Sequence, residues 1–149
     1  MRRIIRGAML VSVLLLSQWQ IALAHEDTEN PETQLRHESM KAARSHLKAI
    51  TLMQDNLLEF KGQLRVQASA LQLFFVSLPD LFPKEGDYSE SDASPEIWNK
   101  WEAFQSYTRD GAKAAEELSF YRDPLSEEAM EAVERVKRAC KGCHDKFRE

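Results

Sequence analysis

Apolar side chains recur at steps of three and four residues along most of the chain after residue 30, which is the spacing of amphipathic helices. Asn30-Pro31-Glu32 combines a strong N-cap, a proline at the first helical position and an acid at the positive end of the helix dipole. The pattern that follows predicts a helix of about 25 residues with a broad inward face. Two adjacent stripes form this face: Leu35, Ser39, Ala42, His46, Ala49 and Met53, and beside them Arg36, Met40, Ala43, Leu47, Ile50, Gln54 and Leu57.

Gly62 predicts a break, after which the same periodicity predicts a second helix. Its inward positions are Leu64, Ala68, Leu71, Phe75, Leu78 and Phe82. Pro79 and Pro83 are expected to bend and end this helix, because proline removes a backbone donor and clashes with the preceding turn. The polar stretch 84–93 (KEGDYSESDA) predicts an exposed loop.

Two more helices follow this loop. Ser94-Pro95-Glu96 repeats the opening of the first helix, and the inward positions after it are Ile97, Trp101, Phe104, Thr108, Gly111, Ala115 and Leu118. Asp123-Pro124 or Ser126 caps the fourth, whose inward positions are Met130, Val133, Val136, Cys140, Cys143 and Phe147. Four such helices with three short connections predict an all-α fold, an antiparallel four-helix bundle.

The first 24 residues have the parts of a secretory signal peptide. These are a positive start with Arg2, Arg3 and Arg6, an apolar run over 8–16, and the small-x-small cleavage pattern Ala22-Leu23-Ala24. The apolar run is short for a membrane span. We therefore expect cleavage, a single mature domain over 25–149, a periplasmic location and no stable membrane insertion; an uncleaved anchor is the alternative.

The charge balance narrows the classes of partner. The chain has 24 acidic and 20 basic residues, a formal net charge of −4, and cleavage of residues 1–24 would remove three arginines and no acid. Such an acidic chain is not expected to bind nucleic acid. Glycine and proline number only five each, which suits long helices.

The clearest chemistry lies near the C-terminus, in Cys140-Lys141-Gly142-Cys143-His144. Two cysteines three residues apart followed by a histidine form the attachment signature of c-type haem. Residues i and i+3 share a helix face, so both thiols can form thioethers with one porphyrin, and His144 can ligate the iron. A zinc site, a thioredoxin-like pair and a disulfide are the alternatives. Zinc needs more ligands than this motif offers, no strand pattern supports a thioredoxin fold, and a disulfide would leave His144 unexplained.

Four stretches in this order resemble the cytochrome c-prime family, and most closely its low-spin, methionine-ligated branch. They are Arg36 to Met40 with the residues that follow, Leu78 to Pro83, Ser94 to Trp98, and Cys140 to His144 with the ending Asp145-Lys146-Phe147-Arg148. The resemblance covers essentially the whole mature chain. It implies one haem c, bound covalently through Cys140 and Cys143 in the bundle interior, with its iron on His144.

The resemblance also places Met40 at the distal position, as a sixth iron ligand. A packing role is the alternative for Met40, and Met53 and Met130 are expected in the core. Bis-histidine ligation through His46 or His37 is a weaker alternative. The resemblance further places Arg36 near the haem propionates; Arg148 is expected at the haem edge or as a helix-end charge.

A His/Met pair fills both axial sites and raises the redox potential, an arrangement typical of electron transfer. We therefore expect a one-electron carrier without enzymatic activity that meets unidentified redox partner proteins. The alternative is a haem protein whose Met40 is absent from the iron or easily displaced, and which binds small gases such as NO and CO. A peroxidase-like enzyme is disfavoured because no distal acid-base pair is evident. The resemblance implies dimerisation through the first two helices, and monomer and homodimer both stay open.

Overall fold

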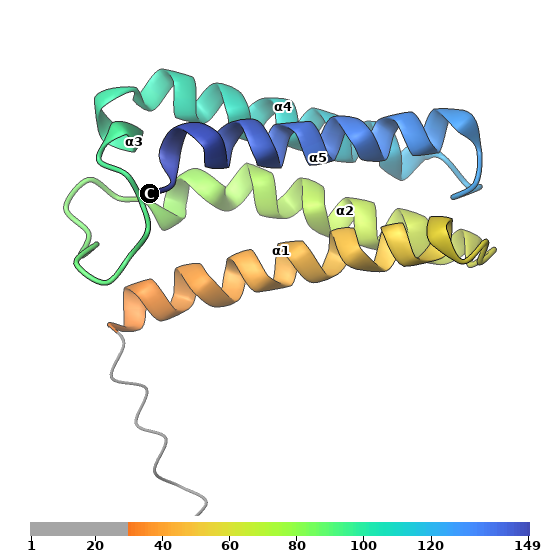
Figure 1. The fold of residues 1–149 in the computed structure, drawn as a ribbon, viewed down its shortest axis with the longest axis horizontal. Coiled ribbons are helices and arrows are strands. Elements are labelled where there is room, and N and C mark those ends of the chain that lie inside the picture. Colours follow the sequence, from red (N-terminus) through yellow and green to blue (C-terminus); the bar gives the residue numbers. More distant parts are fainter. Residues whose placement is uncertain (1–29) are drawn as a thin grey trace, which may run out of the picture.

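The computed structural model describes residues 30–149 and shows the expected helical bundle (Figure 1). The expected signal peptide, residues 1–24, lies outside the described residues. Within them there is no β-strand, only an isolated bridge between Ala93 and Arg148. None of the helices described there has the length and hydropathy to cross a membrane. The elements are α1 (Pro31–Asp55), α2 (Lys61–Ser77), the 3-10 helix η1 (Leu78–Leu81), α3 (Glu96–Asn99), α4 (Trp101–Phe120) and α5 (Glu127–Phe147).

Helix α1 begins where the sequence predicts and has the predicted length of 25 residues. The side chain of Asn30 accepts a hydrogen bond from the Glu32 N–H at 2.8 Å, which satisfies one of the free donors of the first turn. Ile50 and Met53 are buried in the core, as expected. Leu35 is 59% exposed, so the expectation that it faces inward is wrong: it lies on the solvent side of α1.

The turn between α1 and α2 differs from the prediction, because it precedes Gly62. Leu57 has a φ of 53°, and the N–H of Leu58 reaches back to the Met53 carbonyl at 2.8 Å. A left-handed residue with such a bond is a common way to end a helix, although in leucine it costs about 1 kcal/mol. Gly62 therefore lies in the first turn of α2, where it is helical.

The inward stripe of the second helix is confirmed: all six predicted positions are buried. The regular α-helix ends at Ser77, and Pro79 lies in the 3-10 turn η1 that follows. A proline at an early position of η1 needs no N–H partner, which fits this change of helix type. Leu78 and Phe82 continue the buried stripe across the change.

The third predicted helix is interrupted at Lys100. The single turn α3 buries Ile97, and the Trp98 indole N–H donates to the Phe82 carbonyl at 3.2 Å. The backbone leaves helical geometry at Lys100 (φ −128°, ψ 44°), and α4 then begins at Trp101. The break lets α3 contact α5 and reach Phe82 after η1, while the long helix α4 runs along the bundle (Figure 1).

Helix α5 is capped by Ser126, whose side chain accepts from the Ala129 N–H at 3.3 Å, so the Ser126 alternative is confirmed. Val133, Val136 and Phe147 are buried as predicted. Met130 is 43% exposed, so its assignment to the core is wrong.

The helices are packed unevenly around the core. Helix α4 contacts α2 and α5 extensively, and α1 packs on α2, whereas α1 and α5 make few contacts with each other. In Figure 1, α1 and α2 lie on one side of the bundle and α4 and α5 on the other. The loosely packed seam between α1 and α5 leaves room for the site described next.

Candidate haem site

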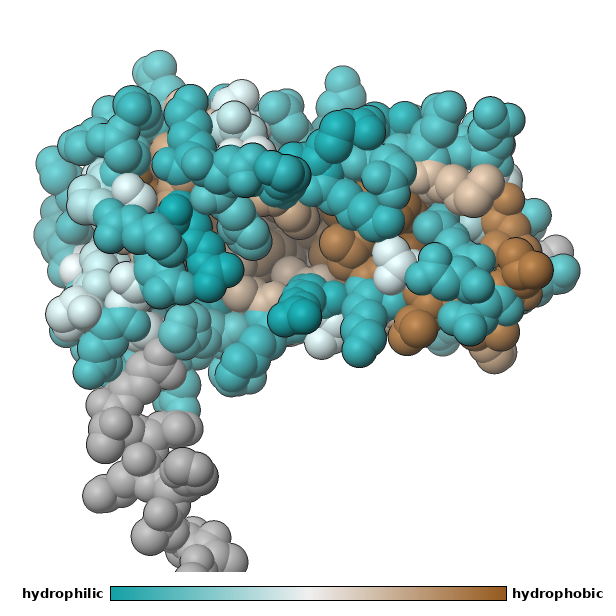
Figure 2. Space-filling model, viewed as in Figure 1, coloured by the Kyte–Doolittle hydropathy of each residue, from teal (hydrophilic) through white to brown (hydrophobic). Residues whose placement is uncertain are grey.

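A cavity of about 610 Å³ opens along this seam at the end of the bundle that holds the C-terminus. Figure 2 shows a hollow on this face, with an apolar floor and hydrophilic residues around it. Its size is within the range of about 300–1,000 Å³ typical of cofactor sites. Its apolar lining consists of Met40, Ala43, Leu47, Leu71, Phe74, Phe75, Leu78, Phe82, Ala93, Ile97, Phe104 and Phe147.

Cys140, Cys143 and His144 all line this cavity from the last turns of α5. Both cysteines are free and partly buried. Burial raises the pKa of Cys143 to about 11 and also raises the pKa of Cys140. Burial and, secondarily, Arg148 lower the pKa of His144, which favours the neutral imidazole that ligates metals. The motif thus presents two thiols and one imidazole to a single cavity, as haem attachment requires.

The zinc alternative for the motif finds no support in the fold. Across residues 30–149, no three or more His, Cys, Asp or Glu side chains cluster in a way that could hold a metal ion. The two cysteines and His144 lack the further protein ligand that a closed structural zinc site needs. A flat apolar cofactor that brings its own metal ligands fits the cavity better.

Met40 is the methionine that reaches the cavity. It lies on α1, across the seam from α5, and is partly buried. The two other methionines of residues 30–149 lie elsewhere, with Met53 in the core and Met130 in a different groove. A thioether from α1 and the imidazole of His144 from α5 therefore line the same cavity, as a distal and a proximal residue would.

The two histidines considered as alternative iron ligands, His37 and His46, lie in different places. His37 lies at the exposed rim of the cavity. His46 does not line the cavity, and its Nδ1 is 2.6 Å from Oε1 of Gln67 on α2. This hydrogen bond gives His46 a role between α1 and α2 and leaves Met40 as the better candidate for the distal side.

Arg36 lines the cavity rim but is only 4% exposed. Its Nη2 donates to Oγ1 of Thr33 at 2.8 Å and to the carbonyl of Asp87 at 2.5 Å. Its guanidinium also lies over the ring of Tyr88. The buried Nε has no hydrogen-bond partner. A contact with a haem propionate thus remains a prediction for Arg36, and its observed contacts hold the 84–93 loop.

Arg148 also lines the cavity, and its side chain is bonded to Asp92, with Nη2 2.6 Å from Oδ2. The backbone reinforces this contact: the Ser94 N–H donates to the Phe147 carbonyl, and the Glu149 N–H to the Asp92 carbonyl, each at 2.9 Å. The end of α5 is thereby fixed against the segment before α3. A contact between Arg148 and the haem edge remains a prediction.

Sequence reasoning missed the role of Tyr88, which lies in a stretch expected to be an exposed loop. Its ring stacks on Phe82 with centroids 6.2 Å apart and lies tilted against Trp98 with centroids 4.3 Å apart, and burial raises the pKa of Tyr88. The one sequence feature that could have indicated this packing is an aromatic residue within the polar run 84–93. Most of the loop is exposed as predicted, but Tyr88 anchors it against the bundle beside the site.

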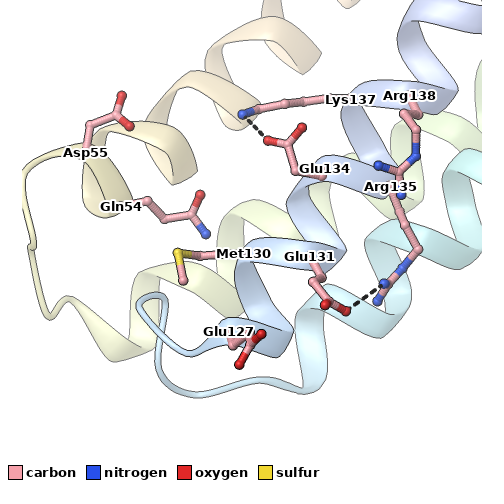
Figure 3. A pocket seen from close by; sticks show the side chains of 9 residues that line it. All are labelled: Gln54, Asp55, Glu127, Met130, Glu131, Glu134, Arg135, Lys137 and Arg138. Atoms are coloured by element: carbon pink, nitrogen blue, oxygen red, sulfur yellow. Dashed lines mark hydrogen bonds and ion pairs between the residues drawn. The ribbon is translucent and has the colours of Figure 1, made fainter.

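A second groove, of about 630 Å³, lies at the other end of the seam, between the end of α1 and the start of α5 (Figure 3). Most of its lining side chains are charged. Some of them form ion pairs along α5, such as Lys137–Glu134 at 2.7 Å. It contains no residue of the haem-attachment motif. Its exposed, charged walls do not suit an apolar cofactor.

A helical bundle with an apolar cavity, lined by a haem-attachment motif on its last helix, indicates the class of c-type haem proteins. The comparison with family models agrees: residues 32–148 match the model described as Cytochrome C', and the chain belongs to the cytochrome c' family. This family binds a covalently attached haem c with its iron.

Individual relatives show how far the similarity extends. A cytochrome c' from Pararhodospirillum photometricum is 28% identical over 116 residues, which cover 76% of this chain and 93% of the relative. The structure of cytochrome c' from Rubrivivax gelatinosus has a TM-score of 0.68 at 21% identity, covering 79% of this chain and 94% of that one. A mutant of cytochrome c' from Rhodopseudomonas palustris has a TM-score of 0.71 at 22% identity, covering 80% and 98%. These structures support the four-helix bundle fold.

A further similar structure is a nitric oxide complex of a cytochrome c prime mutant from Alcaligenes xylosoxidans, with a TM-score of 0.69 at 21% identity, covering 79% of this chain and 93% of that one. Together the comparisons support the cytochrome c' family. They do not support the low-spin, methionine-ligated branch that the resemblance suggested.

Proposed function

We propose that this protein is an exported, non-enzymatic cytochrome c' whose haem binds small neutral gases on the side of Met40. The observation that carries the proposal is the apolar lining that α1 and α2 give to the cavity, where Met40 lies among side chains such as Leu47 and Leu71. The nitric oxide complex of a structurally similar protein supports the same choice. The expected electron carrier with firm His/Met ligation becomes the second candidate.

The roles of the residues follow from their positions. Cys140 and Cys143 would hold the cofactor through thioethers, and His144 would be the proximal ligand on α5. The bound iron would supply the ligand-binding position and one-electron redox chemistry. The apolar side chains of α1 and α2 keep water and ions from the distal side, since a charged group buried there would have no partner. Small uncharged ligands are the class that such a wall admits.

The distal wall also argues against an enzymatic role. General acid-base chemistry needs a side chain such as histidine or a carboxylate within hydrogen-bond reach of the reacting atoms. His37 is exposed at the rim, and the carboxylate of Asp92 is bonded to Arg148. Met40 offers a thioether, which can ligate iron but transfers no proton.

The presence of Met40 in the cavity also favours the second candidate, the electron carrier. A thioether facing the proximal histidine can occupy the sixth position and exclude gases. The two candidates differ in how strongly this sulfur is held. In the proposal Met40 stays off the iron or yields to a gas; in the electron carrier it stays bound in both oxidation states.

Titration of the ferrous protein with carbon monoxide, for wild type and Met40→Leu, separates these candidates. The proposal expects the wild type to bind the gas directly, with a modest change in M40L. A wild type that resists the gas while M40L binds it would contradict the proposal and favour the electron carrier. Met53→Leu is the matched control, because Met53 is buried outside the cavity and should leave gas binding unchanged.

We also propose that the protein works in the periplasm as a homodimer formed through α1 and α2. Apolar side chains on these helices are more than 45% exposed: Leu52, Val66, Leu73 and Val76. Exposed apolar clusters of this kind often mark protein interfaces. Sedimentation equilibrium of wild type and Leu73→Asp tests this: the proposal expects a dimer that the aspartate dissociates, and a monomeric wild type would contradict it.

A further inference from the structure

The ring of Phe75 forms part of the cavity wall and rests against a glycine on the neighbouring helix. Phe75 lies on α2, is 4% exposed and lines the cavity. Gly111 lies behind it on α4. A Cβ added to Gly111 would come within 2.4 Å of Cε1, 2.6 Å of Cδ1 and 2.7 Å of Cζ of Phe75. The ring therefore occupies the space that any other residue at position 111 would need for its side chain.

The neighbours of the Phe75 ring determine the direction in which it can move when a side chain is added at position 111. Helices α2 and α4 pack closely along their length, and Phe74 lies edge-on to Phe75 with centroids 5.7 Å apart. An added methyl group in a packed core forces side chains off their rotamers or shifts the backbone. Because α2 and α4 are held by many contacts, we expect the Phe75 ring to move rather than the helices. The open space beside Phe75 is the haem cavity, which Phe75 lines together with Met40 and Leu47 of α1.

We infer that Phe75 sets the room available to a gas on the distal side, and that Gly111 is the positioning residue that keeps the ring out of that room. This inference rests on the proposed gas-binding function and extends it to a determinant of ligand access. Gly111 touches no ligand itself. Its contribution is the absence of a side chain at a point where the Phe75 ring must be accommodated.

The first test measures carbon monoxide association with the ferrous holoprotein in Gly111→Ala and Phe75→Leu. G111A should slow association roughly tenfold, because the displaced ring narrows the space that the gas must enter; this corresponds to a barrier higher by about 1.4 kcal/mol. F75L should accelerate it. The double variant G111A/F75L should resemble F75L, because the leucine removes the ring that the new methyl group would displace. A double variant as slow as G111A would overturn the inference.

Gly62→Ala provides the matched control. It makes the same chemical change inside a helix, but a Cβ at Gly62 has nothing within 4 Å. Association in G62A should equal that of wild type. Equal rates in wild type, G62A and G111A would overturn the inference while leaving the proposed gas binding intact.

A second readout does not depend on gas binding. The crystal structure of G111A holoprotein should show the Phe75 ring displaced into the cavity, with α2 and α4 at their wild-type separation. If the wild type binds no gas, the proposed function fails, and this structure still decides the placement of the ring. A ring left in place, with α2 and α4 moved apart, would overturn the inference.

Discussion

The guanidinium carbon of Arg36 lies 4.4 Å from the centre of the Tyr88 ring. With the hydrogen bond from Arg36 to the Asp87 carbonyl, this contact joins the first turns of α1 to the 84–93 loop. Glu32 adds a bond, since its Oε2 accepts from the Asp87 N–H at 3.1 Å. The rim of the haem cavity is therefore built by a helix and a loop that are held together by the buried Arg36 and by hydrogen bonds from neighbouring residues.

Replacing Arg36 with glutamine should destabilise the protein by about 2 kcal/mol, because the cation–π contact and a charge-assisted hydrogen bond are lost together. Urea unfolding of the holoprotein measures this change. Arg65→Gln is the control, since Arg65 is an exposed arginine on α2. Equal unfolding midpoints for R36Q and R65Q would show that Arg36 does not hold the loop.

The carboxylate of Asp87 makes the stability of the junction between α1 and the 84–93 loop dependent on pH. The Ser89 N–H and hydroxyl donate to its Oδ1, and Asn30 donates to its Oδ2, so the pKa of Asp87 lies below its ordinary value of 3.8. A lowered acid pKa stabilises the fold above the ordinary value. That stabilisation is lost as the pH falls through the lowered pKa.

Asp87→Asn should therefore lose less stability than the wild type as the pH falls below about 4. Urea midpoints measured between neutral and acid pH test this expectation. Asp110→Asn, an exposed position on α4, serves as the comparison. Parallel acid losses in wild type and D87N would argue against a role for the Asp87 carboxylate.

Replacing Cys143 with serine should leave the haem on a single thioether, with a lower yield of holoprotein, because one of two covalent bonds is absent. The haem α-band in alkaline pyridine reports the number of thioethers. In the double variant C140S/C143S, acid-acetone should extract all of the haem. Haem that resists extraction from the double variant would refute the attachment assignment.

Much of the fold could be predicted from periodicity and capping. The six inward positions from Leu64 to Phe82 are all buried, and Asn30 and Ser126 cap their helices. These predictions succeeded because the burial of an apolar stripe and the satisfaction of first-turn donors are local properties of the sequence. The site motif was readable for the same reason, since Cys140, Cys143 and His144 are neighbours on one helix.

The failures concern contacts between distant segments. Met130 fits the inward spacing of α5 but lies where the seam between α1 and α5 is open, so it is half exposed. Tyr88 sits in a polar run but is held by Arg36, Phe82 and Trp98, which belong to other segments. Periodicity shows only which residues share a helix face. Whether another segment covers that face depends on how the helices assemble.

The most direct test of the central claim is the visible spectrum of the purified ferrous protein before and after carbon monoxide. The account predicts a sharp carbonyl spectrum as soon as the gas is added, starting from a broad high-spin spectrum if Met40 is off the iron or from a low-spin one if the gas displaces Met40. That result would mean that Met40 leaves the iron accessible. A sharp low-spin spectrum that the gas does not alter would contradict the account, because Met40 would then be a firm sixth ligand and the protein an electron carrier.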